Sequence, residues 1–86
     1  MTTKTVTLRY FASIRETLGE SETLTTDAAT LGALRDALIA RGGAHAQVLA
    51  RGKPVRMALN QAMARESQPL PDGGAEVAFF PPVTGG

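Results

Sequence analysis

The sequence feature that most constrains this chain is the stretch of residues 79–86, which reads Phe-Phe-Pro-Pro-Val-Thr-Gly-Gly. Pro81 and Pro82 fix the φ angle and lack backbone donors, so a strand through the two phenylalanines must stop there while the chain continues in an extended form. Gly85 and Gly86 have no Cβ, so the terminal carboxylate can pass through a narrow slot. We therefore predict one folded domain over residues 1–80 and an extended Gly-Gly tail over residues 81–86.

The tail has the properties of an arm that delivers a chemical group. From Pro81 onward it spans at most about 20 Å, at roughly 3.3–3.6 Å per residue, which is enough to enter a partner's pocket. A terminal carboxylate with a pKa of about 3.3–3.7 is ionised and a poor electrophile, so it needs activation, for example as an acyl-adenylate. Two terminal glycines alone would also be compatible with a disordered chain end. Because an aromatic pair and two prolines precede them, we favour the interpretation that the tail delivers a chemical group to a partner.

Composition narrows the classes of function. The chain has 86 residues, no cysteine and a formal net charge of +1, which fits one small domain. The near-neutral charge gives no reason to expect nucleic acid or an anionic membrane as a partner. Without cysteine there is no disulfide, no thiolate nucleophile and no cysteine metal ligand. The first residues lack the apolar run of a signal peptide and no stretch matches a membrane span, so we expect a cytoplasmic location.

Alternation of apolar and polar residues predicts four strands and a further extended piece near Met63. The strands are expected over Thr5–Phe11, Glu22–Thr25, Val55–Asn60 and Glu76–Phe80. The second is rich in threonine and has one leucine, which is typical of an edge strand.

Two aromatic side chains fall on the polar side of this alternation. Phe11 shares its strand face with Arg9, and Phe80 shares its face with Glu76 and Ala78. Because aromatic residues are enriched at binding hot spots, we predict that Phe11 and Phe80 belong to a partner surface. The alternative is that neighbouring segments of the chain cover them.

Helix signals occur in three places. Ser13 and Glu16 have the spacing of a capping box for a short helix that Gly19 closes. Thr30 is the expected N-cap of the main helix, whose leucine stripe over residues 31–39 has the period of a core-facing helix. Residues 44–50 add a further helical turn.

These elements indicate an α+β fold. A single amphipathic helix can cover only one face of a sheet, so we expect a mixed sheet with one main helix packed across it. The first and last strands are expected side by side at the centre of the sheet. This arrangement is a β-grasp, or ubiquitin-like, roll.

The side chains suggest no catalytic centre. His45 has no carboxylate near it in sequence and is predicted to be a surface residue, while Ser13 and Ser21 lack the context of a nucleophile. The acidic residues have no metal-ligand spacing, so we expect no metal and no bound cofactor. The only candidate reactive group is the carboxylate of Gly86.

The sequence resembles the small subunits of molybdopterin synthase, a family of ubiquitin-like sulfur carriers. The resemblance spans the whole chain and is carried by Tyr-Phe-Ala-Ser-Ile-Arg-Glu (10–16), Leu-Asn-Gln (59–61), Pro-Leu (69–70), Asp-Gly (72–73) and Glu-Val-Ala-Phe-Phe-Pro-Pro-Val-Thr-Gly-Gly (76–86). The first and last of these segments are specific, whereas a bare Gly-Gly end is common among ubiquitin-like proteins.

The resemblance implies a mechanism. Gly86, preceded by Gly85, would be adenylated with ATP by an activating enzyme of the ubiquitin-activating type and converted to a thiocarboxylate by a sulfur donor. The tail would enter a pocket of the large subunit and pass sulfur to cyclic pyranopterin monophosphate, within a heterotetramer of two small and two large subunits. The implied contacts with the large subunit are Phe11, Arg15, Met63, Phe80 and the tail residues Pro81, Pro82, Val83 and Thr84.

One departure from the family and three alternatives remain. Gly74-Ala75 stands where family members usually have a single acidic residue, which puts the geometry of the last hairpin in doubt. A sulfur carrier for thiamine synthesis would share the fold and the Gly-Gly end but typically lacks the segments around residues 12–16 and 79–84. A protein modifier would form an isopeptide through Gly86, and a purely structural binding module would not need the last two residues.

Overall fold

The computed structural model describes residues 3–82, which form a five-stranded sheet in the order β2-β1-β5-β3-β4. The strands are β1 (Lys4–Tyr10), β2 (Ser21–Thr26), β3 (Arg56–Leu59), β4 (Ala62–Ala64) and β5 (Glu76–Phe80). The β-grasp, α+β prediction is confirmed, and the predicted weak strand β2 is an edge of the sheet. The tail residues Val83, Thr84, Gly85 and Gly86 lie outside the described residues.

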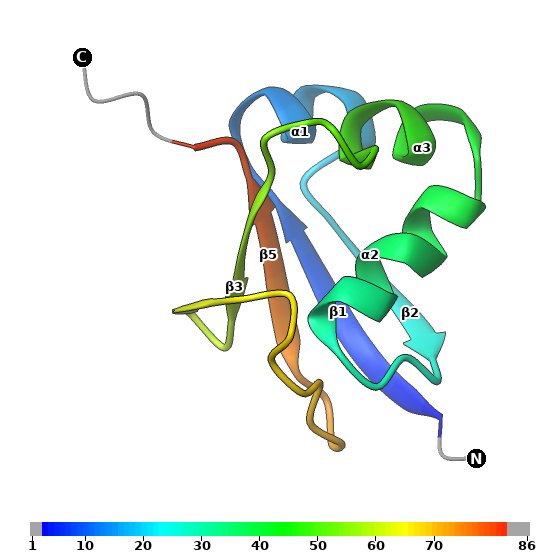
Figure 1. Cartoon of the computed structure of the whole chain (residues 1–86), viewed down its shortest axis with the longest axis vertical. Coiled ribbons are helices and arrows are strands. Elements are labelled where there is room, and N and C mark those ends of the chain that lie inside the picture. Colours follow the sequence, from blue (N-terminus) through cyan, green and yellow to red (C-terminus); the bar gives the residue numbers. More distant parts are fainter. Residues whose placement is uncertain (1–2, 83–86) are drawn as a thin grey trace.

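The first and last strands lie side by side, as predicted (Figure 1). β1 and β5 are parallel, with Leu8 opposite Val77 and Tyr10 opposite Phe79. β5 pairs on its other side with β3, which is antiparallel to it. The sheet is therefore mixed, and β5 carries the chain through the middle of the sheet to the root of the tail.

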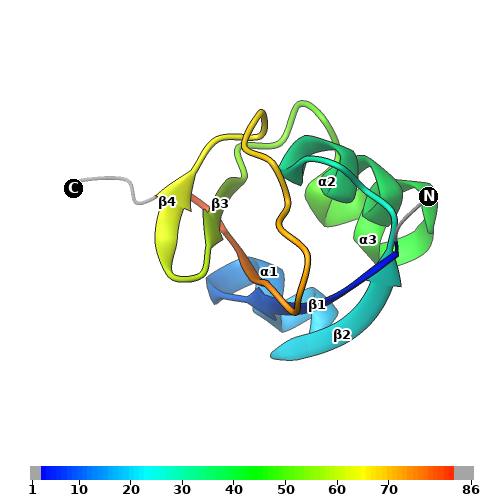
Figure 2. The same ribbon diagram turned by 90° about the horizontal axis from the view of Figure 1, so that it is seen from below.

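Within residues 3–82 there are three helices: α1 (Ala12–Leu18), α2 (Leu31–Ala40) and α3 (Gly43–Leu49). The main helix α2 begins as predicted, because the Thr30 hydroxyl accepts a hydrogen bond from the backbone N–H of Ala33 at 3.1 Å. Figure 2 shows the sheet curling around α2 and α3 and leaving its other face uncovered. We refer to that uncovered side as the open face. No helix within residues 3–82 has the length and apolar character needed to cross a membrane.

The core lies between the sheet and the helices. It consists of side chains that alternate along the central strands, together with the leucine stripe of α2 (Val6, Leu8, Tyr10, Leu31, Leu34, Leu38, Val77 and Phe79). The rings of Tyr10 and Phe79, neighbours in the parallel pair, stack with centroids 5.9 Å apart. The strand alternation in the sequence thus separates a buried face from the open face.

The capping box predicted at Ser13 and Glu16 is not formed. The N-cap of α1 is Phe11, whose carbonyl oxygen accepts the backbone N–H groups of Ile14 and Arg15, and no side chain caps the helix. The chain turns sharply at Ala12, which has φ of 53°, so the helix has already begun at Ser13. The hydroxyl of Ser13 is therefore too far along the helix to serve as its cap.

The loop before β5 also differs from expectation, since β4 and β5 are not a hairpin. β5 pairs with β1 and β3, while β4 pairs with β3 at the edge. Gly73 and Gly74 take positive φ angles of 86° and 88°, a conformation in which glycine is least strained. Ala75 then turns its side chain into the core and accepts the N–H of Thr7 through its carbonyl at 3.0 Å. The loop thus accommodates Gly74-Ala75, where the family usually has a single acidic residue, and β5 pairs regularly with β1 and β3.

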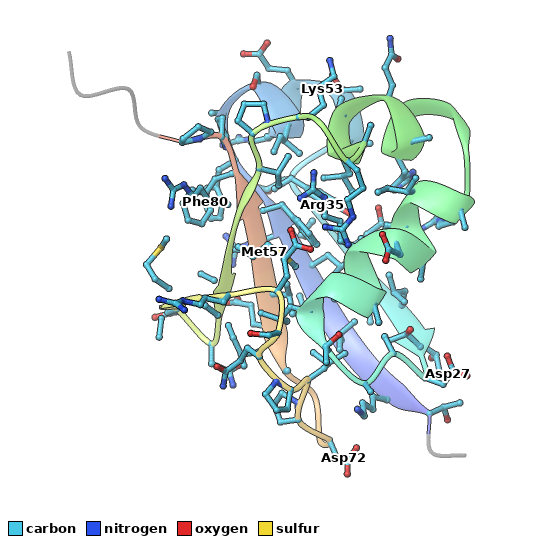
Figure 3. The ribbon with its side chains drawn as sticks, in the orientation of Figure 1. Asp27, Arg35, Lys53, Met57, Asp72 and Phe80 are labelled. Carbon is cyan, nitrogen blue, oxygen red and sulfur yellow. The ribbon has the colours of Figure 1, made fainter. Side chains whose placement is uncertain are left out.

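Arg35 connects the helix layer to the segment between α3 and β3. Its side chain is 5% exposed and lies between α2 and that segment (Figure 3). It donates to the carbonyl oxygens of Leu49 at 2.8 Å, Ala50 at 2.8 Å and Lys53 at 3.2 Å, and to a carboxylate oxygen of Glu66 at 2.9 Å. This one guanidinium satisfies the carbonyl group of the last residue of α3 and two carbonyl groups of the irregular segment that follows it.

His45, predicted to be a surface residue, is partly buried, and the fold gives it a carboxylate partner that is distant in sequence. Its side chain is 18% exposed, and Nε2 lies 2.9 Å from an oxygen of Glu22 on β2. The same carboxylate accepts hydrogen bonds from Arg41 at 2.7 Å and from the Tyr10 hydroxyl at 3.0 Å. The cluster holds α2 and α3 against the edge of the sheet. Burial alone would raise the pKa of Glu22, but the hydrogen bonds from His45, Arg41 and Tyr10 lower it below its ordinary value.

Replacing Arg35 by methionine should lower the free energy of unfolding by about 3–5 kcal/mol, because it leaves buried carbonyls and the Glu66 carboxylate without their donor. Urea denaturation at neutral pH measures this loss. Arg15→Met is the matched control, since Arg15 and its partner Glu20 are 57% and 67% exposed, and such a pair contributes about 1 kcal/mol or less. Equal losses in the two variants would contradict the connecting role of Arg35.

Acidification should remove the contribution of the Glu22 cluster. Because the pKa of Glu22 is lower in the folded chain than in the unfolded one, its stabilisation is present above the ordinary carboxyl pKa of about 4.3 and is lost as the pH falls through the folded value. The difference in unfolding free energy between the natural chain and Glu22→Gln should therefore shrink between pH 7 and pH 3. Urea denaturation across this range tests it, with Glu16→Gln, exposed on α1, as the control. A difference that stays constant with pH would exclude this linkage.

Candidate functional site

The open face carries exposed apolar side chains from three separate elements. Phe11 follows β1 and is 41% exposed, Met63 lies in β4 and is 64% exposed, and Phe80, at the end of β5, is partly exposed. Figure 3 shows Phe80 directed away from the helices, on the opposite side of the sheet from Met57 and Arg35. We call Phe11, Met63 and Phe80 the docking surface.

A groove of about 380 Å³ lies among these three side chains. Its floor forms where Ala78 of β5 pairs with Arg9 on one side and Ala58 on the other, and Ala58 pairs in turn with Met63. Because two alanines stand in the middle of this row, the surface is low there and the larger side chains rise around it. The remaining lining residues are Gln61 and Glu76. An apolar hollow of this kind suits the insertion of an apolar side chain from another protein.

The parallel pairing of β1 and β5 explains why two of these aromatic residues meet. Parallel strands end at the same edge of a sheet, and here the last pair is Tyr10 with Phe79. Phe11 directly follows β1, and its N–H donates to the carbonyl of Phe79 at 3.1 Å. Phe80 is the last residue of β5, so the two residues lie at the same edge of the sheet. The tail begins at the next residue, Pro81, so the docking surface adjoins the root of the tail.

Arg9 holds one side of the groove. Its guanidinium carbon lies 5.9 Å from the centroid of the Phe11 ring, and Nη1 lies 3.5 Å from a carboxylate oxygen of Glu76. These contacts are partly exposed and each contributes about 1 kcal/mol or less. Their effect is to orient the Phe11 ring rather than to stabilise the fold.

The structure brings only some of the predicted site residues together. Phe11, Met63 and Phe80 line one groove, whereas Arg15 lies on α1 and pairs with Glu20 at 3.7 Å. Pro81 and Pro82 are partly buried. Pro81 lines a separate groove of about 260 Å³ between α1 and the loop before β3, whose other walls include Ile14, Val48, Lys53 and Val55. The roles of Arg15 and of the prolines stay predictions.

Sequence reasoning missed the small residues that make the groove. Strand alternation in the sequence already puts Ala58, Ala78 and Arg9 on the open face of their strands. Alternation does not give the order of the strands in the sheet, and it is this order that makes the three residues neighbours. Within residues 3–82 there is no group of three or more His, Asp or Glu side chains arranged to hold a metal ion.

Comparison with known proteins agrees with this architecture. The sequence profile of the ThiS family matches residues 8–86. The molybdopterin synthase sulfur carrier subunits of Escherichia coli (strain K12) and Haemophilus influenzae are 44% and 40% identical to this chain over 78 residues, which is 90% of this chain and 94% of each relative. The similarity therefore covers nearly the whole length of this chain and of each relative.

Solved structures show the same fold. SAMP1 from Haloferax volcanii is 28% identical, with a TM-score of 0.69 over 95% of this chain and 99% of that chain. A chain in the protein–protein complex of subunits 1 and 2 of molybdopterin-converting factor from Helicobacter pylori 26695 is 29% identical, with a TM-score of 0.61 over 95% and 99%. The chain thus has the fold of ubiquitin-like β-grasp proteins, and the similarity extends over nearly its whole length. With a profile match over residues 8–86 and curated relatives that are molybdopterin synthase sulfur carrier subunits, this chain belongs to the ThiS family.

Proposed function

We propose that this chain is the sulfur-carrier small subunit of a cytoplasmic molybdopterin synthase. The docking surface binds the large subunit, and the tail carries sulfur as a thiocarboxylate on Gly86 to cyclic pyranopterin monophosphate. The observation that supports this most directly is the apolar groove on the open face, which ends at Phe80, one residue before the tail. Because Pro81 directly follows Phe80, a partner bound in that groove would lie beside the root of the tail.

The chemistry of the tail requires activation from outside the chain. A carboxylate oxygen of Gly86 attacks the α-phosphorus of ATP on an activating enzyme of the ubiquitin-activating type, and pyrophosphate leaves. A sulfur donor equivalent to hydrosulfide then displaces AMP, which leaves a thiocarboxylate. When the sulfur passes to the pterin, an oxygen from water restores the carboxylate. No side chain of this chain needs to hold the sulfur, and the sequence has no cysteine that could.

The large subunit is the partner that the comparisons favour. The relatives named above are sulfur carrier subunits of molybdopterin synthase, and one structural neighbour comes from a complex of two molybdopterin-converting factor subunits. By analogy the assembly is a heterotetramer of two small and two large subunits. Each small subunit would bring one sulfur atom, so two charged subunits are needed for a dithiolene.

Two alternative functions remain for a chain with this fold and a Gly-Gly end. The likeness to SAMP1, a small archaeal modifier protein, favours a protein modifier as the second candidate, and an isopeptide between Gly86 and a lysine would identify it. A carrier that feeds thiamine synthesis would form the thiocarboxylate but would not support molybdopterin formation. Reconstitution with ATP, activating enzyme, sulfur source, large subunit and pterin precursor separates these cases.

Deleting Gly86 should abolish sulfur transfer, because the activated carboxylate would be displaced from the activating enzyme's reach by one residue. Intact mass measures thiocarboxylate formation, and a fluorescence assay of the oxidised pterin measures product. Affinity for the large subunit should change by less than about threefold, since the docking surface is untouched. A chain without Gly86 that still supported product formation would overturn the proposed function.

Phe80→Ala should weaken binding to the large subunit by about tenfold or more, because it removes an aromatic anchor beside the groove. Isothermal titration calorimetry with the purified large subunit measures this change. Ile39→Ala is the matched control, since it truncates a partly buried apolar side chain that packs against the core from α2. If the control weakened binding as strongly as Phe80→Ala, the open face would not be the docking face.

A further inference from the structure

Arg56 and Arg65 differ from the other arginines in having no acidic partner in the described structure. The sequence contains seven arginines. Five of them lie in ion pairs with carboxylates: Arg9, Arg15, Arg35, Arg41 and Arg51. Within residues 3–82, no Asp or Glu oxygen lies within 4.0 Å of the other two guanidinium groups. Both side chains are exposed.

These two arginines lie close to each other at the β4 side of the sheet. Arg56 pairs with Phe80 across the β3–β5 ladder and shares its face. On the other side of β3, Met57 pairs with Ala64, the last residue of β4, and Arg65 follows it directly.

The two arginines line a hollow that continues from the docking surface. Its volume is about 430 Å³, and its other lining residues are Met63, Ala64 and Gln68. Met63 also lines the groove beside Phe11 and Phe80. The cationic hollow and the apolar groove are therefore adjacent parts of one surface.

We propose that Arg56 and Arg65 together bind a carboxylate side chain of the large subunit, beside the docking surface. This inference rests on the proposed function and names the chemistry that the partner must present. Two like charges that line one hollow repel each other in the free chain. A carboxylate between the two guanidinium groups removes that repulsion and can accept paired hydrogen bonds from either one.

The surroundings favour an acidic protein over other anions. A nucleic acid would need a longer basic stripe, whereas this hollow has two arginines at the edge of an apolar groove and the chain has a net charge of only +1. Apolar anchors at the centre with charged groups at the rim are typical of protein interfaces. At such a rim the arginine pair directs the orientation of docking and accelerates association more than it adds affinity.

The test is stopped-flow association of the large subunit with the R56Q/R65Q double variant over a range of salt concentrations. We expect the association rate constant to fall about tenfold at low ionic strength, and the difference to shrink as salt screens the charges. R56K/R65K keeps the charges but lacks the planar fork, so it should keep the association rate and dissociate faster than the natural chain. Unchanged thermal unfolding of both variants establishes that they are folded.

A37E/Q47E is the matched control. It changes the net charge by the same amount as R56Q/R65Q, at exposed positions of α2 and α3 on the other side of the molecule. The control should keep most of the association rate. If the control lost as much as R56Q/R65Q, the effect would be one of net charge, and the inference would be overturned.

The remaining outcomes separate this inference from the proposed function. If the natural chain and R56Q/R65Q associate at equal rates and both deliver sulfur, only the inference fails. If the variant binds the large subunit normally but forms thiocarboxylate slowly, the pair serves the activating enzyme and the inference fails. If the natural chain neither binds the large subunit nor delivers sulfur, both fail.

Discussion

The parallel pairing of β1 with β5 is the interaction on which the rest of the structure depends. It joins the two ends of the described chain at the centre of the sheet, with Tyr10 opposite Phe79. Because parallel strands end at the same edge, Phe11 and Phe80 emerge side by side and the tail starts next to them. A hairpin between neighbouring strands could not produce this arrangement. The position of the tail root beside an apolar groove is therefore a consequence of topology.

Such pairing requires a long crossover, and the crossover supplies the helices that bury one side of the sheet. α2 and α3 pack on that side, where Arg35 fastens the irregular segment that leads into β3. Nothing in residues 3–82 covers the other side, which keeps Phe11, Met63 and Phe80 exposed. The hydrophobic core and the proposed docking surface thus lie on opposite sides of one sheet.

Patterns in the sequence predicted the elements and the pairing of the first and last strands, but not the contacts between individual side chains that are distant in sequence. Strand alternation placed Phe11 and Phe80 off the core. The face on which a side chain lies depends only on its position along its own strand, and not on which strands lie beside it. The spacing of Ser13 and Glu16 imitated a capping box, but the turn at Ala12 starts the helix earlier. His45 meets Glu22 across 23 positions, a contact set by how α3 packs and invisible to spacing. The groove likewise depends on strand order, which single-strand patterns do not encode.

We propose that the large subunit binds the open face of the sheet and not the helix layer. Chemical-shift perturbation of the ¹⁵N-labelled full chain, titrated with unlabelled large subunit, is the measurement that distinguishes these two faces. We expect the amide signals of β4, of Phe11 and of the carboxyl-terminal half of β5 to change, while those of α2 and the solvent side of α3 do not shift. Changes confined to α2 and α3, with the signals of β4 and β5 unaltered, would contradict it.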